Sequence, residues 1–218
     1  MINIQNYFTK KSKLFSRKGL YEFLGEQYAL LPAKSKILLV GSGGEIAEHL
    51  NRIASKKNFI LKSIDIDEKQ KPDIIGDICI YDFNNKKYDV VILAEVLEHT
   101  HSPQNAINNI YSALKNGGKL IITVPFIFPI HDKPYDYFRF TRYGLELLLE
   151  KFNSIMITEK NNWGEAITVL FVRHVIEKHI GRYFLVIVAF FAYPLLKTLG
   201  NIFKTNAYTT GYYAIAVK

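Results

Sequence analysis

The residues of this chain that could do chemistry stand directly after short apolar runs. Gly41 and Gly43 follow "KILLV", Asp65 follows "FILKSI", and His99 and His131 come after two later runs. Glycines let a ligand approach the backbone closely, a carboxylate accepts hydrogen bonds from hydroxyls, and an imidazole takes up a proton near neutral pH. These residue types in this order predict a small-molecule site.

The residues that follow the glycines restrict the class of ligand. A P-loop requires Lys and Ser or Thr after its last glycine, but Gly44 is followed by Glu45. The dinucleotide fingerprint requires a third glycine where this chain has Ile46. Glu45 also puts negative charge at a helix start, where a pyrophosphate would bind. Alternatively, Glu45 is a first-turn acid that stabilises its own helix. A ligand with cationic groups and no phosphate, such as S-adenosyl-L-methionine, is favoured.

The segments around these residues alternate between apolar runs and helix-like runs. Strands are expected at "KILLV", "FILKSIDI", "PDIIGDI", "YDVVILA", "GKLIITVPF", "SIMITEKN" and "YYAIAVK". We expect a helix at "PQNAINNIYSALKN" to be closed by Gly117 and Gly118, since glycines are preferred at helix C-termini. This alternation predicts βαβ units and a parallel sheet with helices on both faces. Ligands of such sheets bind beyond the carboxyl ends of the strands.

Several motifs together resemble one family. "LLVGSGGE", "SIDID", "GDI", "YDVVILAEVLEH" and "LKNGGKLIITVPF" resemble, in order and spacing, the motifs of class I S-adenosylmethionine-dependent methyltransferases of the type 11 subgroup. The resemblance covers about residues 35–160 and the last strand. It implies an α/β fold with a Rossmann-like, doubly wound, mostly parallel seven-stranded sheet. An N-terminal helix and an apolar helical insert before the last strand would complete this fold.

The resemblance also implies the residues that bind S-adenosyl-L-methionine. The glycine turn would line the methionine part, the acid after the second strand would take the ribose, and the later positions would border the adenine and the methyl group. The positions implied are Gly41, Ser42, Gly43, Asp65, Ile66, Asp77, Ile78, Ala94 and Glu95. Leu39 and Glu45 depart from the family pattern, where an acid and a third glycine are common. An alternative is therefore a catalytically inactive cofactor-binding or scaffold protein.

Candidates for the catalytic role lie past the fourth and fifth strands. His131, Asp132 and His99 could act as a base if the acceptor loses a proton of high pKa. Each has a structural alternative: the His99 segment orders the next helix, and an Asp136–Arg139 pair pins a lid. His99 and His101 lack further ligands nearby in the sequence, so no metal site is expected. Reading Asp65–Asp67 as a metal–sugar-nucleotide motif would instead indicate a glycosyltransferase.

The composition describes a basic globular chain of 218 residues with net charge +8 and a single cysteine, Cys79. One cysteine excludes a disulfide framework, and the charge favours anionic partners. No nucleic-acid module stands out, so we do not expect that partner. The expected divisions are a basic amphipathic helical segment (1–34), the cofactor-binding core (35–162), an apolar helical insert (163–206) and the last strand (207–218).

Two of these divisions suggest a membrane surface. The basic face of the first segment indicates either a helix that caps the core or one that lies on lipid. The run "YFLVIVAFFAYPLL" is shorter than the about 20 residues of a spanning helix, so it is a core helix, an interfacial segment or a re-entrant piece. The segment "HDKPYDYFRFT" resembles type 11 relatives of cell-envelope and polysaccharide synthesis. We therefore expect a methyltransferase that acts on a small-molecule, glycan or lipid-linked acceptor, in the cytoplasm or peripheral on the inner membrane face.

Overall fold

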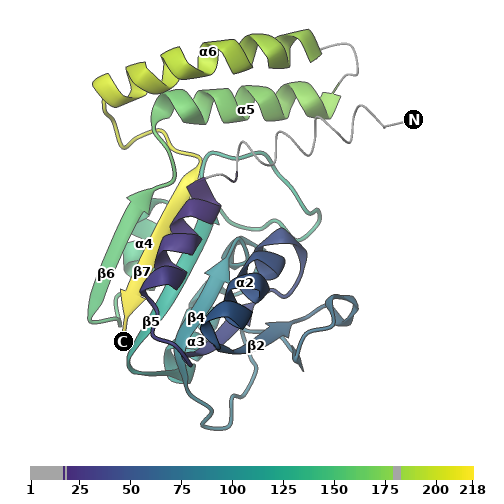
Figure 1. Ribbon diagram of the computed structural model, residues 1–218, viewed down its shortest axis with the longest axis vertical. Helices are drawn as coiled ribbons and strands as arrows, with labels where there is room; N and C mark the ends of the chain where they lie inside the picture. Colours follow the sequence, from purple (N-terminus) through teal and green to yellow (C-terminus); the bar gives the residue numbers. More distant parts are fainter. Residues whose placement is uncertain (1–16, 18, 179–182) are drawn as a thin grey trace.

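One mostly parallel sheet forms the centre of the molecule (Figure 1). The computed structural model describes residues 17, 19–178 and 183–218. Seven strands lie in the order β3-β2-β1-β4-β5-β7-β6, and β7 is antiparallel to both of its neighbours. The strands are β1 (Lys36–Val40), β2 (Ile60–Asp65), β3 (Ile74–Ile75), β4 (Tyr88–Ala94), β5 (Leu114–Pro125), β6 (Ser154–Glu159) and β7 (Gly211–Val217). The predicted fold class is confirmed.

Helices cover both faces of this sheet. A helix over 19–30 and α2 (Gly44–Lys57) cover one face, and α3 (Pro103–Ala113) and α4 (Arg142–Leu148) cover the other. Helices α5 (Trp163–Lys178) and α6 (Tyr183–Ile202) lie beyond one end of the sheet (Figure 1), and η1 (Glu68–Gln70) and η2 (Leu97–His99) are short 3-10 turns. Along β4, Val90 and Ile92 pack with α2 and the 19–30 helix. Val91 and Leu93 of the same strand pack with α3 and α4 on the other face. Burial on both faces explains why the strands read as continuous apolar runs.

The helix over 19–30 packs on the sheet through its apolar side. Leu20, Leu24 and Tyr28 are buried in the same cluster as α2, and the Phe23 ring stacks on Tyr213 of β7 at 4.3 Å between centroids. Within the described residues, this helix therefore caps the core. The basic residues of the predicted amphipathic segment before position 17 lie outside the described residues. The predicted division boundaries remain predictions.

The expectation that Gly117 and Gly118 close a helix is wrong. Helix α3 ends at Ala113, and β5 begins at the next residue, which pairs with Tyr88 of β4. Both glycines lie inside β5, where Gly117 has φ +74° and its N–H donates to the carbonyl of Lys218. A Cβ on Gly118 would lie 2.8 Å from the carbonyl oxygen of Lys115. The glycines serve the tight start of a strand, because the positive φ of Gly117 favours glycine and neighbouring backbone leaves no room for a side chain at Gly118.

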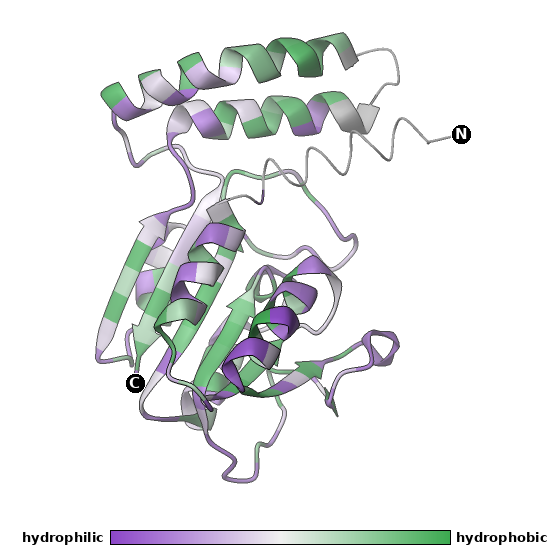
Figure 2. Ribbon diagram, in the orientation of Figure 1, coloured by the Kyte–Doolittle hydropathy of each residue, from purple (hydrophilic) through white to green (hydrophobic). Residues whose placement is uncertain are grey.

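Helices α5 and α6 form an antiparallel hairpin inserted between β6 and β7 (Figure 1). Helix α6 continues through Pro194 to Ile202, so it is longer than the apolar run that marked it in the sequence. Its residues 184–202 are long and apolar enough to cross a membrane by length and composition, and only 11% of them are buried. Figure 2 colours much of α6 as hydrophobic, most continuously over its first half. The interpretation of this run as a core helix is therefore wrong.

The close crossing of α5 and α6 at Gly164 gives a test of the hairpin. A Cβ on Gly164 would lie 1.9 Å from the backbone oxygen of Leu196, so Gly164→Ala forces the two helices apart. We expect a loss of about 1–3 kcal/mol in the free energy of unfolding, measured by urea denaturation. The control is Gly25→Ala in the 19–30 helix, where a Cβ meets nothing within 4 Å. It should stabilise by about 0.5–1 kcal/mol. Equal midpoints for Gly164→Ala and the wild type would contradict this packing.

Candidate functional site

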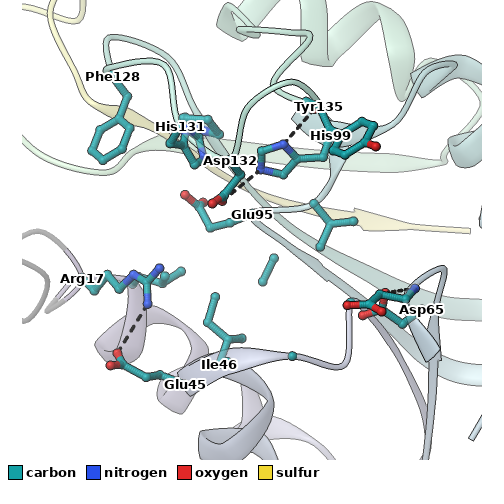
Figure 3. A pocket seen from close by; sticks show the side chains of 18 of the residues that line it. Arg17, Glu45, Ile46, Asp65, Glu95, His99, Phe128, His131, Asp132 and Tyr135 are labelled. Atoms are coloured by element: carbon teal, nitrogen blue, oxygen red, sulfur yellow. Dashed lines mark hydrogen bonds and ion pairs between the residues drawn. The ribbon is translucent and has the colours of Figure 1, made fainter. Parts of the chain in front are cut away.

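A cavity of about 1110 Å³ lies at the edge where β1, β2, β4 and β5 end (Figure 3). Segments that are distant in sequence all contribute to it. The residues that line it are Gly41, Gly43, Gly44, Glu45 and Ile46 after β1; Asp65, Ile66 and Asp67 at β2; Ala94, Glu95, Val96, His99 and His101 at β4; Pro125, Phe128, His131, Asp132, Tyr135 and Tyr137 after β5; and Arg17, Leu20, Gln70, Lys160, Arg173 and Thr210. The site is therefore built where parallel sheets hold their ligands.

The glycine turn presents bare backbone to this cavity. Gly41 has φ +83°, and a Cβ there would lie 2.7 Å from Cγ2 of Val96. Gly44 has φ +75°, and a Cβ on Gly43 would lie 2.5 Å from Oε1 of Gln70. Side chains at Gly41 and Gly43 would clash, and the positive φ at Gly41 and Gly44 favours glycine. The turn can therefore take a ligand directly against its backbone.

Asp65 ties the glycine turn to the end of β2. Its Oδ2 accepts hydrogen bonds from the Ser42 N–H at 2.7 Å and the Ser42 hydroxyl at 3.2 Å. Its Oδ1 accepts one bond, from the Asp67 N–H at 2.9 Å. Because each carboxylate oxygen has two lone pairs, Oδ1 keeps capacity for a hydroxyl from a ligand. Asp65 thus holds the turn and keeps a free acceptor site toward the cavity.

Glu45 lies in the first turn of α2 and is held by the N-terminal helix. The Tyr21 hydroxyl donates to Glu45 Oε2 at 2.8 Å, and Arg17 lies 3.4 Å from the same oxygen. Burial, followed by the hydrogen bond to Glu45, raises the pKa of Tyr21. The position of Glu45 in the first turn of α2 agrees with its interpretation as a first-turn acid. Since Glu45 also lines the cavity, its charge still faces any ligand there.

Glu95, directly after β4, is fixed by one partner in β5 and one directly after β6. The Thr123 hydroxyl of β5 donates to Glu95 Oε1 at 2.7 Å, and Lys160 pairs with the same oxygen. Burial opposes ionisation of Glu95, but the charge and hydrogen bonds of Lys160 and Thr123 outweigh it and hold its pKa below the usual value. Its φ of +55° is unusual for a non-glycine residue. Glu95 is thus a negatively charged group held in place at the cavity wall.

Glu98 stands one turn further on and has the opposite character. Its side chain is fully buried, and neither carboxylate oxygen accepts a hydrogen bond from another residue of the described chain. Burial, and after it the charge of Glu95, raises the pKa of Glu98 well above its usual value. The backbone of Glu98 is well held, since its carbonyl accepts from the N–H groups of Tyr137 and Phe138 at 3.0 and 3.2 Å. A rigid backbone therefore carries an unsatisfied carboxyl group.

The three candidate catalytic residues lie together on one side of the cavity, away from Asp65 and Glu45 (Figure 3). The rings of His99 and His131 are 4.9 Å apart between centroids in an edge arrangement. The Asp132 carboxylate lies 3.9 Å from Nε2 of His99. Nδ1 of His99 is 3.0 Å from the carbonyl oxygen of Tyr135, which only accepts, so Nδ1 carries the proton. The Nε2 lone pair of neutral His99 is therefore available.

The segment after β5 is pinned by the Asp136–Arg139 pair. Arg139 donates to both oxygens of Asp136 at 2.6 and 2.7 Å, and Asp136 also accepts the His131 N–H at 2.9 Å. The hydrogen bonds from Arg139 hold the pKa of Asp136 far below its usual value. Arg139 further donates to the carbonyl oxygen of Pro129 at 3.1 Å. These bonds fix the loop that carries His131.

Nine of the predicted site residues line the cavity and three do not. Those that line it are Gly41, Gly43, Asp65, Ile66, Ala94, Glu95, His99, His131 and Asp132. Ser42 does not line the cavity, but its N–H donates a hydrogen bond to Asp65. Ile78 is buried in the core, and Asp77 accepts from the Cys79 N–H and lies 3.5 Å from His101. Sequence reasoning missed Arg17, Lys160 and Arg173, since no local pattern connects them with the strand ends.

Comparisons with known proteins agree with the family resemblance of the sequence motifs. A profile described as "Methyltransferase domain" matches residues 17–184. A SAM-dependent methyltransferase from Archaeoglobus fulgidus has a TM-score of 0.63 at 16% identity, with 97% of this chain and 100% of that one covered. Phosphoethanolamine N-methyltransferase 2 from Haemonchus contortus, in complex with S-adenosyl-L-methionine, has a TM-score of 0.60 at 16% identity, with 91% of this chain and 52% of that one covered.

Among curated proteins, the lovastatin diketide synthase mokB of Monascus pilosus is 41% identical over 58 residues, which is 27% of this chain and 2% of that protein. The chain thus spans a small part of this synthase and about half of the Haemonchus contortus enzyme. At these identities, the likeness to the solved structures shows the fold.

Asp136→Asn tests the pinned loop. The pKa of Asp136 is depressed in the folded state, so its pair with Arg139 stabilises above the unfolded pKa of about 3.9 and is lost as pH falls below it. At pH 7 we expect a loss of about 1–3 kcal/mol in unfolding free energy, measured by urea denaturation, and this difference should shrink below about pH 4. Glu146→Gln breaks the exposed pair with Arg142 and should change stability by less than about 0.5 kcal/mol. A difference that does not vary with pH would refute this role of Asp136.

Proposed function

This chain belongs to the methyltransferase domain family, whose cofactor is S-adenosyl-L-methionine, and on that premise we propose that it methylates a small-molecule, glycan or lipid-linked acceptor in cell-envelope or polysaccharide synthesis. The observation that carries the proposal is a single cavity whose wall includes the glycine turn, Asp65 and two histidines. A binding site for a cofactor and a group that can handle a proton are therefore close together.

The residues at the β1 and β2 ends fit this cofactor. It supplies a methyl group carried on a sulfonium, and it also bears an ammonium, a carboxylate and an adenosine without phosphate. The bare backbone at Gly41 would approach the methionine part, and Oδ1 of Asp65 would accept from a ribose hydroxyl. Ile66, which is 73% exposed and lines the cavity, offers an apolar contact for the adenine. Glu45 and Glu95 place negative charge near a ligand that carries cationic groups.

The β4 and β5 ends would hold the acceptor. Transfer to a hydroxyl requires removal of a proton of high pKa, and His131, His99 or Asp132, which line the cavity, would accept it. Tyr135 and Tyr137 line the same side and are 61% and 49% exposed. Such rings combine an apolar face with a hydroxyl, which suits amphipathic acceptors such as glycans. Much of the rate would come from holding the acceptor in line.

Binding and transfer assays on Asp65 variants test the proposal. We expect labelled methyl transfer from S-adenosyl-L-methionine into a component of a cell-envelope extract. Asp65→Ala should weaken cofactor binding in calorimetry at least about tenfold, because charge-assisted bonds are lost. Asp73→Ala is the control, since Asp73 pairs with Lys62 at 2.7 Å and does not line the cavity. Folded protein that binds no cofactor would overturn the proposal, and binding without transfer would favour a scaffold protein.

We further propose that the α5–α6 hairpin rests on an anionic membrane surface, with the chain in the cytoplasm. Phe184, Phe190 and Phe191 of α6 are 71%, 69% and 76% exposed, and the chain carries a net charge of +8. Apolar insertion combined with attraction to anionic lipid gives stable peripheral binding. Arg173 of α5 lines the cavity, so the hairpin would bring a lipid-linked acceptor close to the site.

Vesicle sedimentation tests the membrane proposal. Full-length protein should sediment with phosphatidylglycerol–phosphatidylcholine vesicles. The double substitution Phe190→Asp with Phe191→Asp should lower binding about tenfold or more, because burial of each phenyl ring contributes about 1.5–3 kcal/mol. Ile80→Asp, at a site 76% exposed and far along the chain from the hairpin, should bind as the wild type does. Wild-type protein that ignores the vesicles would overturn the proposal.

A further inference from the structure

Three side chains at the acceptor side of the cavity converge on one point. Glu98, His99 and His131 each offer one ligand atom, and these atoms all lie within 4.8 Å of one another. Glu98 Oε1 is 3.8 Å from Nε2 of His99 and 3.9 Å from Nε2 of His131. Two imidazoles and one carboxylate are thus gathered from the ends of two neighbouring strands.

The buried Glu98 carboxyl indicates that a partner belongs at this point. Its side chain is fully buried, and both oxygens lack hydrogen bonds from other residues of the described chain. Buried polar groups in native proteins almost always have such partners. The groups next to Oε1 are the Nε2 atoms of His99 and His131. A cation between them would satisfy the carboxylate and both nitrogens at once.

The second ring nitrogen of each histidine is already held, as metal-binding histidines require. Nδ1 of His99 faces the carbonyl oxygen of Tyr135 at 3.0 Å. Nδ1 of His131 lies 3.3 Å from the carbonyl oxygen of Pro129, and Oδ2 of Asp136, to which Arg139 donates, is also 3.3 Å away. Metal-ligating histidines usually donate this N–H to a carbonyl or carboxylate, which fixes the tautomer and aims Nε2 at the ion.

We propose that Glu98, His99 and His131 bind a divalent first-row transition-metal ion, such as Mn²⁺ or Zn²⁺, at the acceptor side of the cavity. Two imidazoles with one carboxylate suit ions of this class and leave coordination positions open. The Asp132 carboxylate, 3.9 Å from Nε2 of His99, would supply a further ligand at the rim.

A second group of potential ligands serves as the comparison. Asp77, Cys79 and His101 also gather potential ligand atoms within 4.8 Å. There the polar atoms have partners, since Asp77 accepts the Cys79 N–H at 2.8 Å and the Cys79 thiol faces the carbonyl oxygen of Ser102. No atom of this second group has the unsatisfied, fully buried character of the Glu98 oxygens. The ion is therefore assigned to the Glu98 group.

An open coordination position facing the cavity would take an oxygen of the acceptor. A cation lowers the pKa of an oxygen that it binds, so it would replace direct proton removal by a histidine. This effect on the acceptor oxygen is the only part of the metal proposal that rests on the proposed methyl transfer. The binding of the ion depends on the side chains alone.

Direct metal binding tests the inference without an acceptor. Full-length chelator-treated protein is titrated with MnCl₂ and, separately, ZnSO₄, and bound metal is measured by equilibrium dialysis with elemental analysis and by the Mn²⁺ EPR signal. We expect a single ion per chain. Glu98→Gln, which keeps the shape of the side chain, and His131→Ala should each weaken binding at least about tenfold. His101→Ala should bind as the wild type does.

The outcomes separate the inference from the proposed function. Folding of each variant is checked by circular dichroism, and S-adenosyl-L-methionine binding is measured on the same samples. No bound metal in wild-type protein that still binds the cofactor overturns the metal site alone. Loss of the ion in His101→Ala with retention in Glu98→Gln also overturns it. Metal binding by folded protein that does not bind S-adenosyl-L-methionine supports the site and contradicts the proposed function.

Discussion

The burial of β1 and β4 on both faces is the constraint on which the rest of this structure depends. Ile37 and Leu38 face opposite helical layers, as do Val91 and Ile92, so polar groups are disfavoured along these strands. Polar side chains that could bind a ligand are therefore expected where the strands end. Because the strands are parallel, those ends lie at one edge of the sheet. The parallel pairing of β1 with β4 keeps the two strand ends close together, and Val96 leaves no room for a side chain at Gly41.

The two acids after β4, Glu95 and Glu98, lie at the same edge of the sheet but differ in how their carboxyl groups are stabilised. Glu95 is ionised because Thr123 of the neighbouring strand β5 and Lys160, directly after β6, meet it. Glu98 is more deeply buried than Glu95, but no such donor reaches it within the described chain. An unpaired buried carboxylate is costly, so the fold holds Glu98 either neutral or against a cation. The loop pinned by Asp136 and Arg139 brings His131 to this carboxyl, which links the stability of the loop to the chemistry of the site.

The α5–α6 hairpin adds two properties to the sheet at once. Its inner helix contributes Arg173 to the cavity, while α6 exposes a largely apolar surface. The helices pack closely because Gly164 leaves room for the backbone at Leu196. One insert therefore carries both a surface that suits lipid and a residue of the cavity wall. This arrangement is the structural basis for proposing a lipid-linked acceptor.

The sequence by itself determined the strands, the glycine turn, the acid at Asp65 and the family. These features depend on apolar runs and on turn chemistry, which are local and therefore readable along the chain. The prediction that Gly117 and Gly118 close a helix was wrong, because pairing of β5 with β4 overrode the helix-end pattern. Only the tertiary structure brought Arg17 to Glu45, Lys160 to Glu95 and His131 to Glu98. Those contacts join residues far apart in sequence, and strand order and loop packing decide them, because no local propensity records which charges will meet.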